Sequence, residues 1–180
     1  MRSILPIFAL LAIAAARAAI VECGCDPAHP ETLEARQCAL CREAEKQPPD
    51  IRVFFIKDAS PRKPNRWLAL PRAHTTGYHG LQDMSPEDRA ELWAAAIAKA
   101  TELFGDEWGL AYNGEDVRSQ CHTHIHIGKL LKGVERDNFI LVSKPSQIPA
   151  VPGEGLWVHP VGKKLHVHTG EQICETVLVR

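Results

Sequence analysis

The sequence predicts an α+β domain in which one long helix packs on a mainly antiparallel sheet. Three observations indicate this class. Residues 85–105 have apolar residues at helical spacing, and several short runs of β-branched and aromatic residues are separated by turn-forming residues. No internal repeat or low-complexity block interrupts the 180 residues, so we expect a single core.

The long helix is expected to begin after Ser85 and to end before Gly105. Ser85 is a suitable N-cap, Pro86 suits the first helical position, and Gly105 favours termination. The side chains that should face the core recur every three or four residues, and they are Trp93, Ile97, Ala100 and Phe104.

The sheet is expected to contain a hairpin at each end of the domain, with further strands between them. Residues 51–56 and 67–70 should form the first hairpin around a turn-rich loop. Thr32 to Glu45 has a helix-forming composition. The other extended segments follow the long helix: 109–113, 121–127, 139–142, and the pair 156–158 and 165–167, which flanks Gly162-Lys163-Lys164 as a second hairpin.

The first 18 residues are expected to be a signal peptide rather than part of the fold. Arg2 gives a positive start, an apolar run extends from Ile4 to Ala16, and Ala16-Arg17-Ala18 matches an A-x-A cleavage site. The run is shorter than the roughly 20 apolar residues that a membrane-spanning helix needs. We therefore expect an exported protein, periplasmic or extracellular, with an uncleaved membrane anchor as the alternative.

The rest of the chain divides into two parts. Residues 19–36 are polar and contain proline, and we expect an extended lead-in there. Residues 37–180 are expected to form the single domain, with the second hairpin as a C-terminal extension.

The charge balance excludes some classes of partner. Lys plus Arg total 21 and Asp plus Glu total 22, which gives a net charge of −1. A nucleic-acid coat or a polybasic membrane-surface protein needs an excess of positive charge, so we expect neither kind of partner. A small phosphate-containing ligand needs only a local basic site and stays open.

The six cysteines are an even number, which suits disulfide formation in an exported protein. Their pairing is left open by the sequence. Cys38-Ala39-Leu40-Cys41 is a C-x-x-C, which could bind zinc, form a redox pair or pair with cysteines elsewhere.

The most informative segment runs from Ser119 to Gly128, in which three histidines alternate with Thr and Ile. In a strand, this period of two places His122, His124 and His126 on one face and the residues between them on the other. Aligned imidazoles can bind a metal ion, or one of them can act as a nucleophile towards phosphorus while its neighbours orient it. The sequence therefore predicts either a metal site or a catalytic site on this segment.

The segment His122-Thr-His-Ile-His-Ile resembles the signature of the histidine-triad (HIT) superfamily. The resemblance extends upstream to Leu70-Pro71-Arg72-Ala73-His74, and then to a long helix and a strand that ends in Asn113. It covers about Cys38 to Leu131, and it implies a HIT-like fold and an enzyme.

The resemblance also implies roles for individual residues. His124 would be the nucleophile that attacks the α-phosphorus of a nucleotide-containing substrate and forms a nucleotidyl-histidine intermediate. His122 would orient the site, and His126 would contact the phosphate region. Ser119 and Gln120 would face phosphate oxygens, and Asn113 would lie near the ribose and the nucleophile. No cofactor would be required for this chemistry.

Gln120-Cys-His-Thr-His-Ile-His126 is similar to the exported CDP-diacylglycerol hydrolase branch of the superfamily. The implied reaction is hydrolysis of a pyrophosphate bond, with CDP-diacylglycerol as one candidate substrate. The alternatives are a nucleotidyltransferase of the same fold and a non-catalytic exported metal-binding module. Relatives often form dimers, so a homodimer is a further expectation.

Two metal sites are further expectations. Some relatives, including galactose-1-phosphate uridylyltransferases, hold a structural zinc, and the matching positions here are Cys38, Cys41, His74 and His122. The alternative is a disulfide at Cys38 or Cys41. A second set, His159, His166 and His168 around the last hairpin, is expected to be surface or half-buried strand residues, with a metal site as the less favoured alternative.

Overall fold

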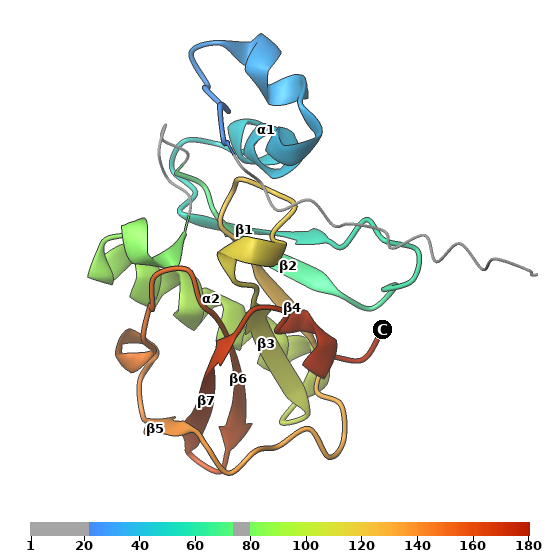
Figure 1. Ribbon diagram of the computed structural model, residues 1–180, viewed down its shortest axis with the longest axis vertical. Coiled ribbons are helices and arrows are strands. Elements are labelled where there is room, and N and C mark those ends of the chain that lie inside the picture. Colours follow the sequence, from blue (N-terminus) through green and yellow to red (C-terminus); the bar gives the residue numbers. More distant parts are fainter. Residues whose placement is uncertain (1–21, 74–79) are drawn as a thin grey trace, which may run out of the picture.

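The computed structural model describes residues 22–73 and 80–180, and its centre is a seven-stranded antiparallel sheet (Figure 1). The order of the strands is β1-β2-β4-β3-β6-β7-β5. The mainly antiparallel α+β class is therefore confirmed. The strands are β1 (Val53–Lys57), β2 (Trp67–Pro71), β3 (Trp108–Tyr112), β4 (Ile125–Lys129), β5 (Ile140–Val142), β6 (Gly155–Val161) and β7 (Lys164–Glu171).

Two α-helices accompany the sheet in the described ranges. α1 (Ala39–Glu45) is short, and α2 (Pro86–Phe104) has 19 residues. The hydroxyl of Ser85 accepts a hydrogen bond from the Asp88 N–H at 3.1 Å, and Gly105 ends the helix with φ of 59°. Both ends of α2 therefore lie where the capping residues predict them.

Short 3-10 helices fill the connections between these elements. They are η1 (Pro30–Glu34), η2 (Arg36–Cys38), η3 (Leu81–Asp83), η4 (Glu115–Val117), η5 (Pro145–Gln147) and η6 (Glu175–Val177).

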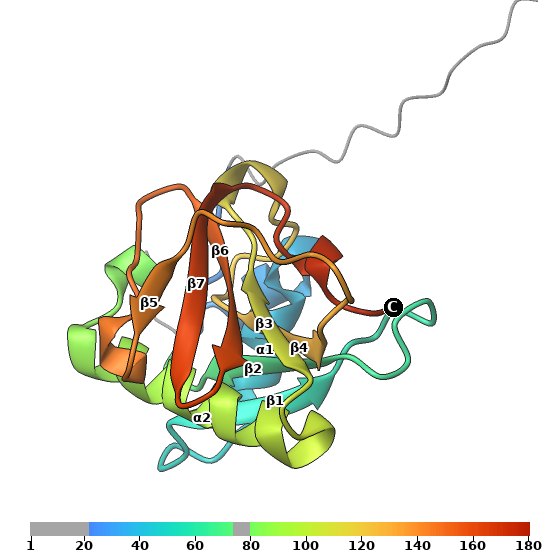
Figure 2. The same ribbon diagram turned by 90° about the horizontal axis from the view of Figure 1, so that it is seen from below.

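The helix α2 covers one face of the sheet, as Figure 2 shows. The indole of Trp93 and the side chain of Leu92 are fully buried there, against Leu110 and Ile127 of the sheet. This cluster is the main hydrophobic core.

The opposite face of the sheet carries the histidines. Ala111 of β3 pairs with His126 of β4 on one side and with Trp157 of β6 on the other, so these three side chains share a face. α1 packs over β1 and β2 on this face, and η6 packs over β3. The face is thus covered at both sides by short elements.

The lead-in is not extended, contrary to expectation. From Pro30 onwards it forms 3-10 turns, and two disulfides, Cys25–Cys38 and Cys23–Cys121, attach it to the domain. A short polar segment without strand partners satisfies its backbone groups by local turns, and covalent links hold it in place.

The second predicted hairpin is β6–β7. Its two-residue turn has Gly162 with φ of 59° and no positive φ at Lys163, the pattern of a type II′ turn. Only glycine takes that first position without strain.

The predicted signal peptide, residues 1–18, lies outside the described residues, as does His74. Among residues 22–73 and 80–180, none of the helices has the length and apolar character needed to cross a membrane.

Candidate active site

The strand that carries the histidine row is shorter than the sequence predicts. β4 begins at Ile125, so only His126 lies in it, while His122 and His124 lie in the bends that precede it. The reason is the partner of the preceding residue: Cys121 is bonded to Cys23, and its N–H donates to the carbonyl of Gln37 at 2.8 Å. The backbone before β4 therefore pairs with the lead-in rather than with the sheet.

His124 lines a cavity of about 560 Å³ and is only 8% exposed. Its Nδ1 lies 2.9 Å from the carbonyl oxygen of His122, which can only accept a hydrogen bond. Nδ1 therefore carries the proton, and the lone pair of the neutral ring is on Nε2. Burial lowers the pKa of His124, and the nearby Arg118 lowers it further, so the imidazole is neutral at pH 7.

His126 lies beside His124, with the ring centroids 5.0 Å apart in an edge-to-face arrangement. Its Nε2 is 3.5 Å from Nδ2 of Asn113, and its Nδ1 is 3.7 Å from a carboxylate oxygen of Glu175. Burial lowers the pKa of His126 well below its usual value, and His124 adds to this effect. His126 is therefore also neutral at pH 7.

Asn113 is fixed by the backbone of the C-terminal segment. Its side-chain oxygen accepts hydrogen bonds from the N–H groups of Cys174 at 2.9 Å and Glu175 at 3.0 Å. These two bonds identify which end of the amide is the oxygen and direct the amide nitrogen towards His126. The predicted proximity of Asn113 to the histidines is confirmed.

His122 does not line the cavity. It is fully buried, and its Nε2 donates a hydrogen bond to the carbonyl of Pro71 at 2.7 Å. The expectation that all three rings share one wall is wrong for His122, because the chain bends before β4. Its backbone carbonyl nevertheless holds the ring of His124, so it contacts the predicted nucleophile through the main chain.

The cavity has one apolar side and one charged side. Ala39 and Leu40 of α1, with Ile56 and Leu68 of the first hairpin, form the apolar side. The charged residues of the lining are four basic side chains, Arg36, Lys57, Lys63 and Arg118, and two acidic ones, Asp58 and Glu175. The formal charge of the lining, with neutral histidines, is thus positive, which suits a phosphate group.

Ser119 and Gln120 both line the cavity, but they differ in their contacts. Ser119 is exposed. Gln120 accepts a hydrogen bond from the N–H of Leu40 at 3.2 Å and donates one to the carbonyl of Arg36 at 3.0 Å. Both ends of the Gln120 amide are therefore used to hold α1 and the segment before it, which leaves Ser119 as the better candidate for a phosphate contact.

Glu175 is a part of the site that the sequence did not indicate. Its carboxylate pairs with the Lys63 ammonium, lies 3.5 Å from Arg66 and faces His126. Burial would raise the pKa of Glu175, but His126, Lys63 and Arg66 overcome this effect and lower it to about 2. Lys63 and Glu175 lie 112 residues apart, and no motif connects them, so only the fold reveals the pair.

The predicted zinc set does not form in this structure. Cys38 is bonded to Cys25, so its sulfur is not a thiolate that zinc could bind. Cys41 is a buried thiol, and burial raises its pKa to about 12. Of the two alternatives for Cys38, the disulfide is the one that the structure holds.

Three groups of side chains in the described ranges have donor atoms close enough to hold a metal ion. Cys25, Cys38 and Cys121 are one group, but disulfides occupy these sulfurs. Asp58, His126 and Glu175 are a second, in which Lys63 and Arg66 already neutralise the carboxylates. The third group, on β6 and β7, is separate from the cavity of His124 and is discussed below.

A scan against models of protein families and a search of curated proteins found no match to this chain. The chemistry of the site is therefore inferred from the residues themselves and from their geometry.

Proposed function

We propose that the protein is an exported hydrolase that cleaves a nucleoside phosphate or pyrophosphate bond with Nε2 of His124 as the nucleophile. The observation that carries the proposal is the hydrogen bond from Nδ1 of His124 to the carbonyl of His122. It leaves the Nε2 lone pair available in a ring that burial keeps neutral, and such a ring is a competent nucleophile. The resemblance of the histidine row to the HIT signature supports the same role.

The reaction has two displacements at one phosphorus atom. In the first, Nε2 of His124 forms a bond to the α-phosphorus while the bond from phosphorus to the leaving oxygen breaks, and the leaving group departs as a phosphate anion. In the second, water attacks the same phosphorus, the N–P bond breaks and the nucleoside monophosphate leaves. The proton lost by the water passes to solvent, and His124 regains its neutral form.

Charge that develops on the phosphate oxygens needs donors that are already in place. Arg118 and Lys63 line the cavity beside the histidines and can supply them, with the Ser119 hydroxyl as a neutral donor. After the first displacement the ring of His124 is cationic. The His122 carbonyl, which accepts its Nδ1–H, stabilises that cation.

The composition of the cavity agrees with a nucleotide. The apolar side, with Leu40, Ile56 and Leu68, can pack against a base or an acyl chain, while the basic residues face the phosphates. CDP-diacylglycerol has both parts, and its hydrolysis would give CMP and phosphatidate. The two disulfides agree with an exported protein, which would meet a lipid substrate outside the cytoplasm.

Trapping the covalent intermediate tests the proposal. The protein is mixed with CDP-diacylglycerol or a nucleoside diphosphate labelled at the α-phosphorus and quenched in base, which preserves N–P bonds. We expect the wild-type chain to retain label on one histidine, located by peptide mapping. His124→Gln should retain no label and should lose turnover by at least about a hundredfold, because the nucleophile is removed.

The matched control is His29→Gln, because His29 is an exposed histidine away from the cavity. This variant should label like the wild type. Label that persists in a folded His124→Gln would contradict the proposal. A product that appears only with a phosphate or sugar-phosphate acceptor would instead identify the transferase alternative.

A further inference from the structure

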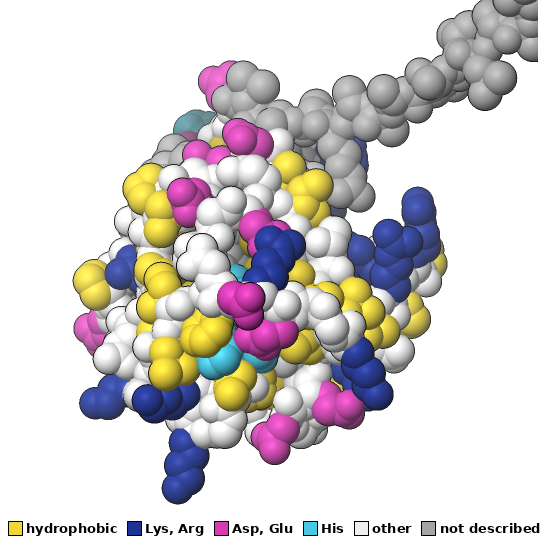
Figure 3. Space-filling view, turned by 60° about the horizontal axis from the view of Figure 1, so that its bottom comes forward, with side chains coloured by type: hydrophobic (Ala, Val, Ile, Leu, Met, Phe, Trp, Pro, Cys, Tyr) yellow, Lys and Arg dark blue, Asp and Glu magenta, His cyan; other side chains and the backbone are white. Residues whose placement is uncertain are grey.

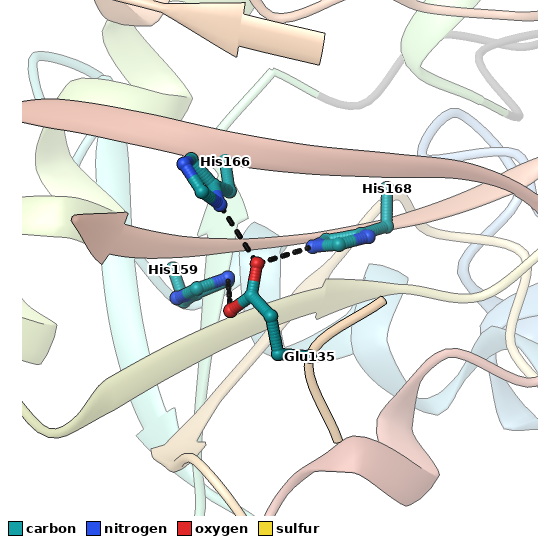
Figure 4. A group of neighbouring side chains, drawn as sticks. All are labelled: Glu135, His159, His166 and His168. Atoms are coloured by element: carbon teal, nitrogen blue, oxygen red, sulfur yellow. Dashed lines mark hydrogen bonds and ion pairs between the residues drawn. The ribbon is translucent and has the colours of Figure 1, made fainter. Parts of the chain in front are cut away.

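Four side chains of metal-binding type converge on the β6–β7 hairpin (Figure 4). Nε2 of His159 lies 2.8 Å from one carboxylate oxygen of Glu135, and Nδ1 of His166 lies 2.7 Å from the other. Nε2 of His168 lies 3.7 Å from the same oxygen as His166. The four donor atoms all lie within 4.8 Å of one another.

The register of the hairpin explains why the three rings meet. His159 of β6 is directly opposite His166 of β7, and Trp157 is opposite His168. Residues opposite each other share a face, and residues two apart on one strand share it too, so all three histidines lie on one face. Glu135 comes from the loop between β4 and β5 and reaches this face from outside the hairpin.

The rings are held in fixed orientations by their neighbours. His168 stacks on Trp157 with centroids 3.6 Å apart and planes 7° apart, and His166 stacks on Phe139 at 3.7 Å and 10°. A site whose ligands are already oriented loses little conformational entropy when it binds. The packing thus suits a preformed binding site.

The hydrogen bonding of His168 indicates what is missing between the ligands. Its Nδ1 lies 3.2 Å from the carbonyl oxygen of Asn138, so Nδ1 carries the proton and the lone pair of the neutral ring is on Nε2. That lone pair faces the carboxylate of Glu135, which has no proton to offer at neutral pH. A backbone carbonyl that fixes the tautomer of a histidine is the usual outer partner of a metal ligand.

Burial makes this arrangement costly without a cation. His159 is 4% exposed and His168 is 2% exposed, and the Nε2 atoms of both are fully buried and make no hydrogen bond. Both atoms are aimed at Glu135, and Figure 4 shows all three rings pointing to its carboxylate. A cation at the centre would satisfy the lone pairs and the carboxylate together.

We propose that Glu135, His159, His166 and His168 form a binding site for a divalent transition-metal ion, with Zn²⁺ as the first probe. Three imidazole nitrogens and one carboxylate oxygen suit Zn²⁺, and such a donor set also binds Fe²⁺, Co²⁺ and Ni²⁺. Neighbouring solvent reaches the site, because Glu135 is exposed and histidine surface appears beside acidic surface in Figure 3. A metal can therefore enter without unfolding.

The proposed metal site is independent of the proposed hydrolase activity. β3 lies between β4, which carries His126, and β6, which carries His159. A metal here would cross-link the loop of Glu135 to the β6–β7 hairpin. Its expected role is structural, and its test uses metal binding and thermal stability rather than turnover.

The test measures Zn²⁺ binding by the full chain after removal of metals with a chelator and without reductant, so that the disulfides stay closed. Calorimetric titration should give one Zn²⁺ per chain, and Zn²⁺ should raise the melting temperature. Glu135→Gln and His166→Ala each remove one ligand and should weaken binding by about a hundredfold or more, since even the loss of an outer-shell partner costs about 10–100-fold.

Two control variants distinguish the sites. Glu87→Gln changes an exposed carboxylate on α2, and His126→Gln removes a ligand of the group with Asp58 and Glu175; both should keep Zn²⁺ binding. Circular dichroism checks that each variant is folded, and Co²⁺ absorption should change in His166→Ala but not in His126→Gln. Failure of the wild type to bind Zn²⁺, or binding that is lost in His126→Gln and kept in a folded Glu135→Gln, would overturn the proposal.

Discussion

At the scale of single residues, the site depends on main-chain groups that fix side-chain protons. The carbonyl of His122 fixes the tautomer of His124, and the N–H groups of Cys174 and Glu175 fix the amide of Asn113. A backbone group cannot change its chemistry by substitution, so each of these orientations depends only on the fold. The buried rings are therefore prepared before a substrate arrives.

Glu175 makes a large contribution to stability that depends on pH. Its pKa falls from 4.5 in the unfolded chain to about 2 in the folded protein, because the charges around it outweigh its burial. A lowered pKa in the folded state means that the contribution is complete above pH 4.5 and disappears as the pH falls towards 2. The difference corresponds to about 3 kcal/mol.

We therefore predict that Glu175→Gln lowers the free energy of unfolding by about 3 kcal/mol at pH 6 and by almost nothing near pH 2. Urea unfolding of the wild type and the variant at a series of pH values measures this difference. Glu31→Gln, which changes an exposed carboxylate, should leave the curve of stability against pH unchanged. A constant difference between pH 6 and pH 2 would show that Glu175 acts by packing and not by its charge.

The sequence indicates the kinds of residue in the site better than their positions. It predicts His124, His126 and Asn113, because a histidine row and a strand-end asparagine are local patterns. It does not predict Glu175 or Lys63, since charged residues in loops carry no pattern, and their meeting depends on the path of the C-terminal segment. Long-range ion pairs of this kind become visible only in the folded chain.

At the scale of elements, local signals determine what the sequence can predict. Ser85 and Gly105 give the ends of α2, and Gly162 gives the turn of the β6–β7 hairpin. The start of β4 is missed, because the alternating pattern continues through His122 although the backbone there pairs with the lead-in. A pattern of period two indicates a strand only where a neighbouring strand is present to pair with it.

The disulfide Cys23–Cys121 is the element that attaches the lead-in directly before the histidine row. Its sequence separation is 98, whereas that of Cys25–Cys38 is 13. On the loop-entropy model, the longer link stabilises by about 5 kcal/mol and the shorter by about 3 kcal/mol. Each link restricts the unfolded chain, and the longer one restricts it more.

We predict that the double variant Cys23→Ser, Cys121→Ser lowers the free energy of unfolding by about 2 kcal/mol more than the double variant Cys25→Ser, Cys38→Ser. Urea unfolding without reductant compares the two, and a thiol assay in denaturant should count two free thiols in the wild type, Cys41 and Cys174. Equal losses in the two variants would indicate that native contacts of the lead-in, rather than loop length, determine the stabilisation.

At the scale of the whole molecule, the two faces of the sheet have different tasks. One face packs against α2 and forms the main core. The other carries His124 and His126 in a cavity between α1 and the C-terminal segment, and the proposed metal ligands further along the same face. A rigid sheet with one fully packed face can hold functional side chains on the other at fixed distances.

Arg66 links the C-terminal segment to this functional face. It is 2% exposed, and its guanidinium donates to the carbonyls of Glu175 at 3.0 Å, Leu178 at 2.6 Å and Val179 at 2.8 Å. These bonds hold the segment on which Glu175 approaches His126. A single buried cation therefore connects the loop before β2 with the end of the chain and with the site.

We predict that Arg66→Ala lowers the free energy of unfolding by about 3 kcal/mol, because several buried carbonyls lose a charged donor at once. The segment after Ile173 should also become more accessible, so carboxypeptidase should shorten the chain faster, and covalent labelling of His124 should slow as Glu175 moves from His126. Arg62→Ala is the matched control, since Arg62 is an exposed arginine in the same loop. If Arg66→Ala remained within about 0.5 kcal/mol of the wild type, as ordinary surface substitutions do, the C-terminal segment would be held by its apolar contacts alone. The position of Glu175 would then follow from the packing of Val177 and Leu178 on the sheet and not from the buried guanidinium.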